Sequence, residues 1–485
     1  MEERSDNSNE SPSSPKRARN CSDENERVDR ISGLPDFVLL QILSLLDMKD
    51  AVKAGVLSKR WERLWASVPD LFFWESSPDD DSDDHEDEFV NLVDRTLILY
   101  EGSKIRKFGV LCYEYRAWFA SYVDSWIRFV VRKKVENLDL DLWPSEYGDH
   151  YELPRHLYSN ASLTKLRLSY CHFRPPLSGL FSWRLLTSLS LNHIPLSDNL
   201  IQDILSGSPS LQVLDLSECS GFMHLNITSP CLKKLMVNYD DYDSTTSDSV
   251  LEISAPYLQS LALIGLWYRK CRLMNLPCLV QAKLLIEVVP DNGDRDNGYE
   301  WRYNFLRELL ENLHHVRDLK IGTWCIQILS TWELKILPSP SSKRKCLILD
   351  TCLDKLDLPG IASLLKSSPD LETLLVSKTI PPFYSVYLHD FDGENYWESS
   401  EPFSQCLLHN LKTVKIFDFI GGDHEMDLVQ FILKHAMTLE KMVIYSKRLA
   451  HLNWRKHFMP EELLEFTEEI LSFPRASPHA VILLS

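Results

Sequence analysis

A motif of three apolar residues returns along most of the 485-residue chain at a nearly constant interval. Its second and third apolar residues are two positions apart, so on a β-strand both side chains point to the same face. The motif fits Val135/Leu138/Leu140 and Leu163/Leu166/Leu168, and it starts again at Leu186, Leu211, Leu232, Leu258 and Leu279. Successive copies start 21 to 28 residues apart. A unit of this size cannot bury its own apolar face, so the copies must stack against one another.

Proline residues mark the same interval. A proline stands two positions before the first apolar residue at Pro209, Pro230, Pro256, Pro277 and Pro369. Because proline cannot continue a helix, it separates each convex segment from the next strand, and residues 198–206 and 360–366 are expected to be such convex helices. The interval resembles that of leucine-rich repeats. The resemblance implies an α/β solenoid over residues 100–380, with a parallel sheet on the concave side and helices on the convex side.

Two cysteines fit this scheme. Cys171 and Cys219 follow the last leucine of their strands by three residues, where such repeats place an inward-facing Asn or Cys, and we expect buried structural thiols. The 11 cysteines include no C-x-x-C pair, so a structural zinc site is not expected.

The residues that flank the central leucine of each strand point to the concave side, which is the usual binding surface of such a solenoid. A merely solvated sheet face is the alternative for any one of them. The candidate target-facing residues are Lys165, Arg167, Ser169, Ser188, Ser190, Asn192, Val213, Asp215, Ser217, Lys234, Met236 and Asn238.

Residues 34–66 predict three short helices, over about 37–46, 48–56 and 59–66. Pro35 suits the first turn of a helix, and Asp47 and Ser58 can cap the second and third helices. Eight of the ten residues 37–46 are apolar, so this helix has almost no polar face. Either the rest of the chain or another protein must therefore cover its second side.

This segment resembles an F-box: Leu34-Pro35, the leucines that follow, and Val56-Leu57-Ser58-Lys59-Arg60-Trp61 are in register with that motif. The resemblance implies that residues 28–74 dock a Skp-type adaptor, and through it a cullin and a RING protein. Leu34 or Trp61 would be the natural anchor, since buried apolar and aromatic groups dominate interface energies. The docking residues implied are Leu34, Pro35, Leu39, Ile42, Leu43, Leu57 and Trp61. The alternative, for about half of them, is that they only hold the three helices together.

The C-terminal part is less regular. Residues 381–402 form a polar and aromatic insertion, and a helix is expected at about 424–437 between strands at Leu411/Val414/Ile416 and Leu439/Met442/Ile444. Residues 400–480 resemble the FBD region of plant F-box proteins, which points to a plant source. We expect a strand–helix–strand unit that closes the solenoid, since terminal repeats must cap the core.

The net charge of −18 is unevenly distributed, because residues 75–88 hold nine acidic residues and no Lys or Arg. Such a run repels itself and is expected to form a linker. Residues 1–27 are polar and are expected to be a disordered tail with no signal-peptide core, which predicts a nuclear or cytosolic protein. No apolar run is long enough to span a membrane, and the acidic balance argues against nucleic-acid binding.

Motifs for nucleotide binding, metalloprotease chemistry and serine-hydrolase chemistry are absent from the sequence, so no catalytic residue, metal or cofactor is expected. The combination predicts a non-catalytic subunit of a ubiquitin ligase of the Skp–cullin–F-box type, whose concave face holds a target protein. A binding scaffold outside any ligase and, with less support, a small-molecule co-receptor are the alternatives.

The tail contains a short basic cluster, Lys16, Arg17 and Arg19, which is either a nuclear import signal or part of a solvated tail. If it directs import, replacing all three residues with Gln will shift a fluorescent fusion of the full chain from the nucleus to the cytosol. An unchanged distribution in cells would contradict the import signal.

Overall fold

The computed structural model describes residues 31, 33–75, 85–145, 148–174, 181–239, 250–267, 269–288, 298–334, 341–379, 408–446 and 460–484. The predicted tail with its basic cluster, and the insertion at 381–402, lie outside these residues. None of the helices within them is both long and apolar enough to cross a membrane.

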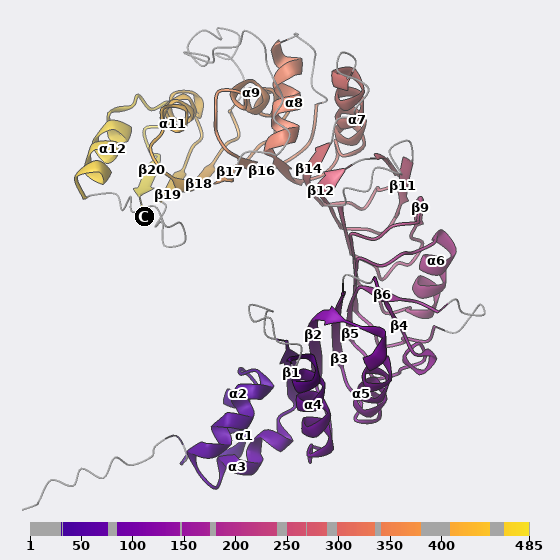
Figure 1. The fold of residues 1–485 in the computed structure, drawn as a ribbon. Helices are drawn as coiled ribbons and strands as arrows, with labels where there is room; N and C mark the ends of the chain where they lie inside the picture. The colour runs from indigo at the N-terminus through magenta and orange to yellow at the C-terminus, as the bar shows by residue number, and fades with distance from the viewer. Residues whose placement is uncertain are drawn as a thin grey trace, which may run out of the picture.

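Among the described residues, fifteen strands form one parallel sheet that lines the inner side of an arc (Figure 1). The strands follow one another in chain order, apart from the short strands that lie outside this sheet. They are β1 (Asp70–Trp74), β2 (Lys107–Tyr115), β3 (Asn137–Pro144), β5 (Lys165–Ser169), β7 (Ser188–Asn192), β8 (Val213–Ser217), β10 (Lys234–Tyr239), β12 (Ser260–Trp267), β14 (Gln281–Val288), β15 (Asp318–Gly322), β16 (Cys346–Thr351), β17 (Thr373–Lys378), β18 (Thr413–Phe419), β19 (Lys441–Ser446) and β20 (Val481–Leu484).

Helices lie along the outer side of the arc in most repeats (Figure 1). They are α4 (His85–Ile98), α5 (Ala120–Arg132), α6 (Asp198–Gly207), α7 (Gly298–Asn312), α8 (Thr323–Leu334), α9 (Leu358–Lys366), α11 (Asp423–His435) and α12 (Pro460–Ser472). The 3-10 turn η3 (Ala117–Phe119) precedes α5, and the 3-10 turn η4 (Arg155–Leu157) follows the short strand β4 (Tyr151–Glu152). The predicted solenoid with convex helices near 198–206, 360–366 and 424–437 is confirmed by α6, α9 and α11.

The repeat motif sets the register of the sheet. Leu166 of β5 is opposite Leu189 of β7, and the same row continues through Leu214 and Leu235. All four side chains are at most 2% exposed, so each row of leucines forms a continuous buried column. Stacking in register is therefore how each unit buries the apolar face that it cannot cover alone.

The middle of the convex side differs from the prediction. There the strands β9 (His224–Asn226), β11 (Val250–Ser254) and β13 (Lys270–Met274) form a second parallel sheet in place of helices. The units starting at Leu211 and Leu258 are only 21 residues long, which leaves room for an extended segment but little for a helix. Two further short strands, β4 (Tyr151–Glu152) and β6 (Cys171–His172), pair nearer the N-terminus.

The boundaries expected from the sequence also change. The sheet begins at β1, within the range 28–74 that the sequence assigns to the docking module and well before residue 100. Val68, Leu71 and Phe73 have the spacing of the repeat motif and are all buried, so the signal for this strand was present. Helix α4 begins at His85, so residues 85–88 belong to a helix rather than to the linker 75–88. At the other end, β18, α11 and β19 form the expected strand–helix–strand unit, but α12 and β20 add one more.

Each of three neighbouring strands of the sheet, β5, β7 and β8, is followed by a residue in the left-handed backbone conformation. Tyr170, His193 and Glu218 have φ angles of 57°, 49° and 51°, which turn the chain away from the sheet. Cys171 and Cys219, as predicted, are buried free thiols beside these turns. The Cys219 thiol donates to the Ser217 carbonyl at 3.3 Å, and burial raises its pKa to about 12, which keeps it protonated.

Helices α8 and α9 approach each other closely at Gly360. An ideal Cβ at this position would lie 2.0 Å from the carbonyl oxygen of Ile326, and the Gly360 N–H donates to the Ser330 hydroxyl at 2.8 Å. Since the obstacle is backbone, the helices can accept a side chain here only by moving apart.

We therefore expect Gly360→Ala to lower the free energy of unfolding by about 1–3 kcal/mol, as overpacking does elsewhere. Gly422→Ala is the matched control, because it stands at a helix N-terminus with a φ of −70° and a Cβ there would meet only Glu425 at 3.8 Å. Urea unfolding of both variants measures the difference. Equal midpoints for Gly360→Ala and the wild-type chain would contradict the close approach.

Candidate functional site

The first candidate site is the N-terminal module. It comprises α1 (Asp36–Leu43), α2 (Met48–Lys53), the 3-10 turn η1 (Ala54–Leu57), α3 (Trp61–Leu64) and the turn η2 (Trp65–Ser67). The Asp47 carboxylate caps α2, as predicted, by accepting from the Asp50 N–H at 2.7 Å. Helix α3 starts later than predicted, at Trp61, and its N-cap is Arg60 and not Ser58. The Ser58 carbonyl accepts from the Trp61 N–H at 3.0 Å. Asp36 pairs with Arg60 and ties α1 to the segment before α3.

Three of the predicted docking residues form the core of this module. Leu39, Leu43 and Trp61 are 0%, 1% and 4% exposed and pack with Met48 and Ala51. Side chains covered this completely have no surface to offer a partner, so their assignment to the docking face, and Trp61 as its anchor, is corrected. They hold the short helices together.

The remaining predicted residues reach the surface to different degrees. Leu34 is half-buried, whereas Pro35, Ile42 and Leu57 are exposed. Exposed apolar side chains that the sequence prediction did not include lie beside them in the chain. Together with Ile42 and Leu57 they form what we call the exposed apolar set: Phe37, Ile42, Leu45, Leu46, Val56 and Leu57.

Exposure in this set is high, at 87% for Leu45, 90% for Val56 and 71% for Leu57. Residues 37–46 are almost wholly apolar, so a second side of this segment had to need cover, and Phe37, Leu45 and Leu46 lie on it. One side is covered by Leu39 and Leu43 packing inward, and the described part of the chain leaves the other side in contact with solvent. Clustered apolar exposure of this kind marks interaction sites in folded proteins.

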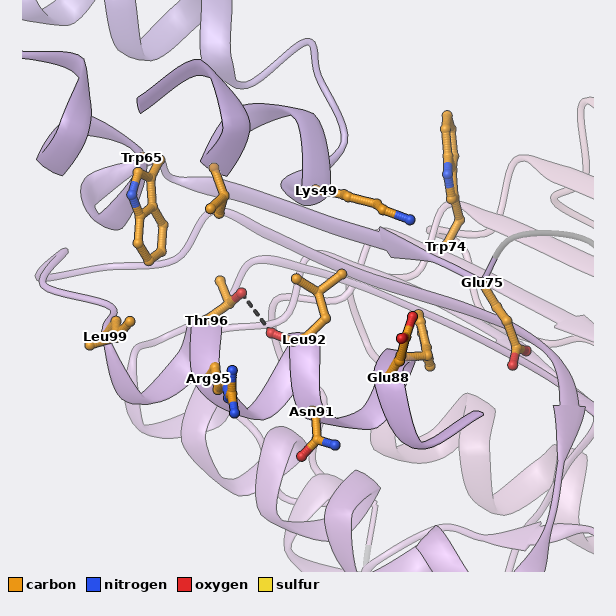
Figure 2. A pocket seen from close by; sticks show the side chains of 12 residues that line it. Lys49, Trp65, Trp74, Glu75, Glu88, Asn91, Leu92, Arg95, Thr96 and Leu99 are labelled. Carbon is orange, nitrogen blue, oxygen red and sulfur yellow. Dashed lines mark hydrogen bonds between the residues drawn. The ribbon is translucent and has the colours of Figure 1, made fainter. Parts of the chain in front are cut away.

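A cleft of about 590 Å³ lies between the module and α4 (Figure 2). Trp65 from the module, Leu92 from α4 and Leu99, which directly follows α4, give it apolar walls. Trp74 and Glu75 at the end of β1 line its far side. Within α4, the Thr96 hydroxyl donates to the Leu92 carbonyl at 2.7 Å. The module is thus packed against the first helix and strand of the solenoid.

The second candidate site is the concave face of the sheet. Lys165, Arg167 and Lys234 are exposed on it, as predicted. The other target-facing candidates that reach the surface are half-buried: Ser188, Ser190, Asn192, Val213, Asp215, Ser217, Met236 and Asn238. Ser169 is the exception, since it is 0% exposed and its assignment to the binding face is corrected. Ser169 lies between Asp141 and Asn192 of the two neighbouring strands, and Tyr170 is the next residue of the chain.

Several polar groups of the concave face satisfy one another. The Asp215 carboxylate accepts from the Ser190 hydroxyl at 3.1 Å and from the Ser217 hydroxyl at 3.0 Å, and Asn238 donates to Glu218 at 3.3 Å. Burial raises the pKa of Asp215, and the nearby hydroxyls and Arg167 oppose this shift. These groups form a satisfied network rather than free binding groups.

Stacked rings form one rim of this face. The ring centroids of Trp143 and Tyr170 are 4.8 Å apart, with the rings tilted by 36°. The ring centroids of Tyr170 and His193 are 4.4 Å apart, and these two rings stack at an interplanar angle of 10°. Trp143 is 51% exposed, so the row offers an aromatic surface to the inside of the arc. The left-handed conformations of Tyr170 and His193 bring these rings together, which a motif search based on apolar spacing does not detect.

A third cluster, Cys352, Asp354 and Asp357, places possible metal-ligating atoms within 4.8 Å of one another. Asp357 is fully buried, and its oxygens accept from Thr351 at 2.7 Å, Gln327 at 3.1 Å, Cys352 at 3.2 Å and the Asp354 N–H at 3.3 Å. Its acceptor sites are therefore used within the protein, and the cluster is a hydrogen-bond network between β16 and α9. Burial, with a contribution from Asp354, raises the pKa of Asp357 to about 6, although the bonds from Thr351, Cys352 and Gln327 act in the opposite direction.

Comparison with known proteins gives matches to two family models. Residues 31–73 match the F-box domain, and residues 100–459 match the leucine-rich-repeat domain described as At1g61320/AtMIF1. The second match therefore continues from the repeats through most of the range 400–480.

Whole-length relatives come from Arabidopsis thaliana. The F-box/LRR-repeat protein At3g03360 is 30% identical over 95% of this chain and 92% of its own length. The F-box/LRR-repeat protein At5g02910 is 29% identical, covering 87% of this chain and 89% of its own length. A protein named as an F-box/FBD/LRR-repeat protein, At4g03220, is 28% identical, with 91% of this chain and 94% of its own length covered.

The raised pKa of Asp357 predicts a pH dependence of stability. Because the folded chain binds this proton more tightly than the unfolded chain, the stabilising contribution is complete below about pH 4 and is lost as the pH rises through 6. Asp357→Asn removes this dependence, so the stability of the wild-type chain relative to the variant will fall by on the order of 3 kcal/mol between pH 4 and pH 7. Urea unfolding at several pH values measures it. The exposed Asp370→Asn is the control, and a constant difference between wild type and Asp357→Asn would refute the assignment.

Proposed function

Because the chain belongs to the plant F-box/LRR-repeat family, and so is an F-box protein of the substrate-adaptor type, we propose that it is the target-recognition subunit of a Skp–cullin–F-box ubiquitin ligase. The observation that carries the proposal is the exposed apolar set of the module. Fully burying one such side chain contributes about 1.5–3 kcal/mol, so covering several of them stabilises a complex substantially.

The two candidate surfaces have separate binding roles. The exposed apolar set binds a Skp-type adaptor, which connects the chain to a cullin and a RING protein. The concave face of the sheet holds the target. The chain performs no bond chemistry of its own in this scheme: it raises the effective concentration of the target near the ubiquitin-conjugating enzyme.

The packing of the module supports this division. The buried residues of the module, such as Leu39 and Trp61, belong to the same apolar cluster as Leu71 and Phe73 of β1. The module and the sheet thus share one core. A partner bound to the module is therefore held at a fixed position relative to a target bound inside the arc.

A binding scaffold outside any ligase would use the same adaptor contact. Affinity purification from plant cells with the proteasome blocked separates the two possibilities. A ligase subunit will recover the adaptor together with a cullin, and its target will accumulate in a knockout. Recovery of the adaptor without a cullin, and with no protein accumulating in the knockout, would favour the scaffold.

Aspartate substitutions in the exposed apolar set test the docking surface. We expect the double variant Leu45→Asp/Leu57→Asp to weaken adaptor binding at least hundredfold, because charged groups would have to be buried in an apolar contact. Both residues are solvent-exposed, so the chain should fold normally. Ile98→Asp on α4 is the matched control, with a side chain that is 78% exposed. Calorimetry with a purified Skp-type adaptor measures binding, and full binding by the double variant would rule out this surface.

A further inference from the structure

A hollow of about 500 Å³ opens on the concave face over the first strands of the sheet. We call it the basic hollow. Its lining comes from β1, β2, β3, β5 and β7, and Ser44, at the end of α1, also contributes. Because Ser44 of the docking module lines it, the hollow is next to that module. Figure 1 shows β1, β2 and β3 at the same end of the arc as α1 and α2.

Positive charge is in excess in this hollow. Asp70 binds Arg106 through two bonds of 2.7 Å, and its carboxylate is also 3.5 Å from the Lys107 ammonium. The Asp70 side chain is only 11% exposed, whereas the side chains of its two cationic neighbours, Arg106 and Lys107, are 51% and 57% exposed. One carboxylate thus serves two cations, and the more exposed of them keeps its donors available.

Lys165 and Arg167 extend this excess onto β5. The Arg167 Nε lies 3.9 Å from the nearest Asp139 oxygen, which is too far for a hydrogen bond. Lys165 has no ion-pair partner among the residues that the structure describes. Asp141 and Asp215 also influence Arg167, but neither lines the hollow.

Phe72 gives the hollow an apolar wall. Its ring lies against the sheet over Gly109, where an ideal Cβ would be 2.3 Å from the ring. Glycine at this position is what allows the ring to approach the sheet this closely, and 39% of Phe72 remains exposed. The hollow therefore combines an apolar surface with ammonium and guanidinium donors.

We propose that the basic hollow binds an acidic, extended segment of the target protein, with carboxylates of that segment on Lys107 and Lys165. The inference rests on the proposed function and adds the chemistry of the target to it. Lys107 and Lys165 share one row of the sheet, separated by Asn137 of β3. Two strand spacings amount to about 10 Å. An extended chain of the polyproline II type has three residues per turn and rises about 3.1 Å per residue, so carboxylates three residues apart lie on one side of it at about 9 Å.

Charge complementarity favours this occupant over a basic one. The lining holds three cationic side chains, Lys107, Lys165 and Arg167, against the two carboxylates of Asp70 and Asp139, so the local charge attracts an acidic peptide. Within the hollow, Asp70 is hydrogen-bonded to Arg106, and the Asp139 carboxylate has the Arg167 guanidinium 3.9 Å away. A basic segment would therefore approach both carboxylates against a cation that is already beside them.

The test uses the full chain purified with a Skp-type adaptor and a fluorescein-labelled peptide that carries Glu at every third position between Ser residues. Fluorescence anisotropy compares this probe with the same peptide carrying Gln. The Glu probe is expected to bind more tightly, with an affinity that falls as salt is added. Lys165→Gln should weaken binding about threefold to fivefold, and Lys107→Gln/Lys165→Gln about tenfold or more.

Lys434→Gln is the matched control, because it removes the same charge away from the concave face. Lys434 is an exposed residue in the last turn of α11 and lies outside the hollow. It should change the affinity less than twofold. Equal binding of the Glu and Gln probes, or unchanged binding by Lys107→Gln/Lys165→Gln, would overturn the proposal. Displacement of the probe by citrate at the same concentration as unlabelled peptide would show a small-anion site and would also overturn it.

Adaptor recovery in the same preparations reports on the proposed function separately. Loss of probe binding with the adaptor retained in Lys107→Gln/Lys165→Gln supports both proposals. A wild-type chain that binds the Glu probe but no adaptor would contradict the ligase role and leave the acidic-segment site intact.

Discussion

The constraint on which this structure depends is that no single repeat can bury its own apolar face. Columns such as Leu166, Leu189, Leu214 and Leu235 close the core only because neighbouring strands stack in register. Once that register is set, the residues between the leucines must point into the arc. The composition of the concave face, with Arg167, Ser190 and Asp215 in one row, is thus a consequence of the core.

A stack of strands also has ends, and its first strand would expose an unpaired edge without cover. Here the docking module packs at the β1 end, and the residues that one would assign to partner binding, Leu39, Leu43 and Trp61, are used to build that packing. The module therefore has two roles. Its inward side completes the core at the start of the solenoid, and its outward side, with Leu45 and Leu57, remains for a partner.

The sequence predicted what depends on local spacing. The strands, the helices near 198–206 and 360–366, the Asp47 cap and the buried Cys171 and Cys219 all follow from short-range rules. The division of the module into core and surface could not be predicted from these rules, because an almost wholly apolar helix does not show which of its sides packs against its own chain. The burial of Ser169 depends on groups from neighbouring strands, and the close packing at Gly360 on a neighbouring helix, so neither has a signal in its own segment.

The shared core also determines how the chain can act. Since Trp61 of the module and Leu71 of β1 belong to one apolar cluster, the module does not behave as a separate domain on a linker. Proximity catalysis requires that the target be held at a restricted distance and orientation, because a freely moving tether raises effective concentration far less than a fixed geometry. A target segment in the basic hollow would be bound a few strands from the module, where that geometry is set by packed side chains. Weak ion pairs at Lys107 and Lys165 then suffice for recognition, because a rigid, preorganised solenoid lowers the entropic cost of binding that each weak pair must offset.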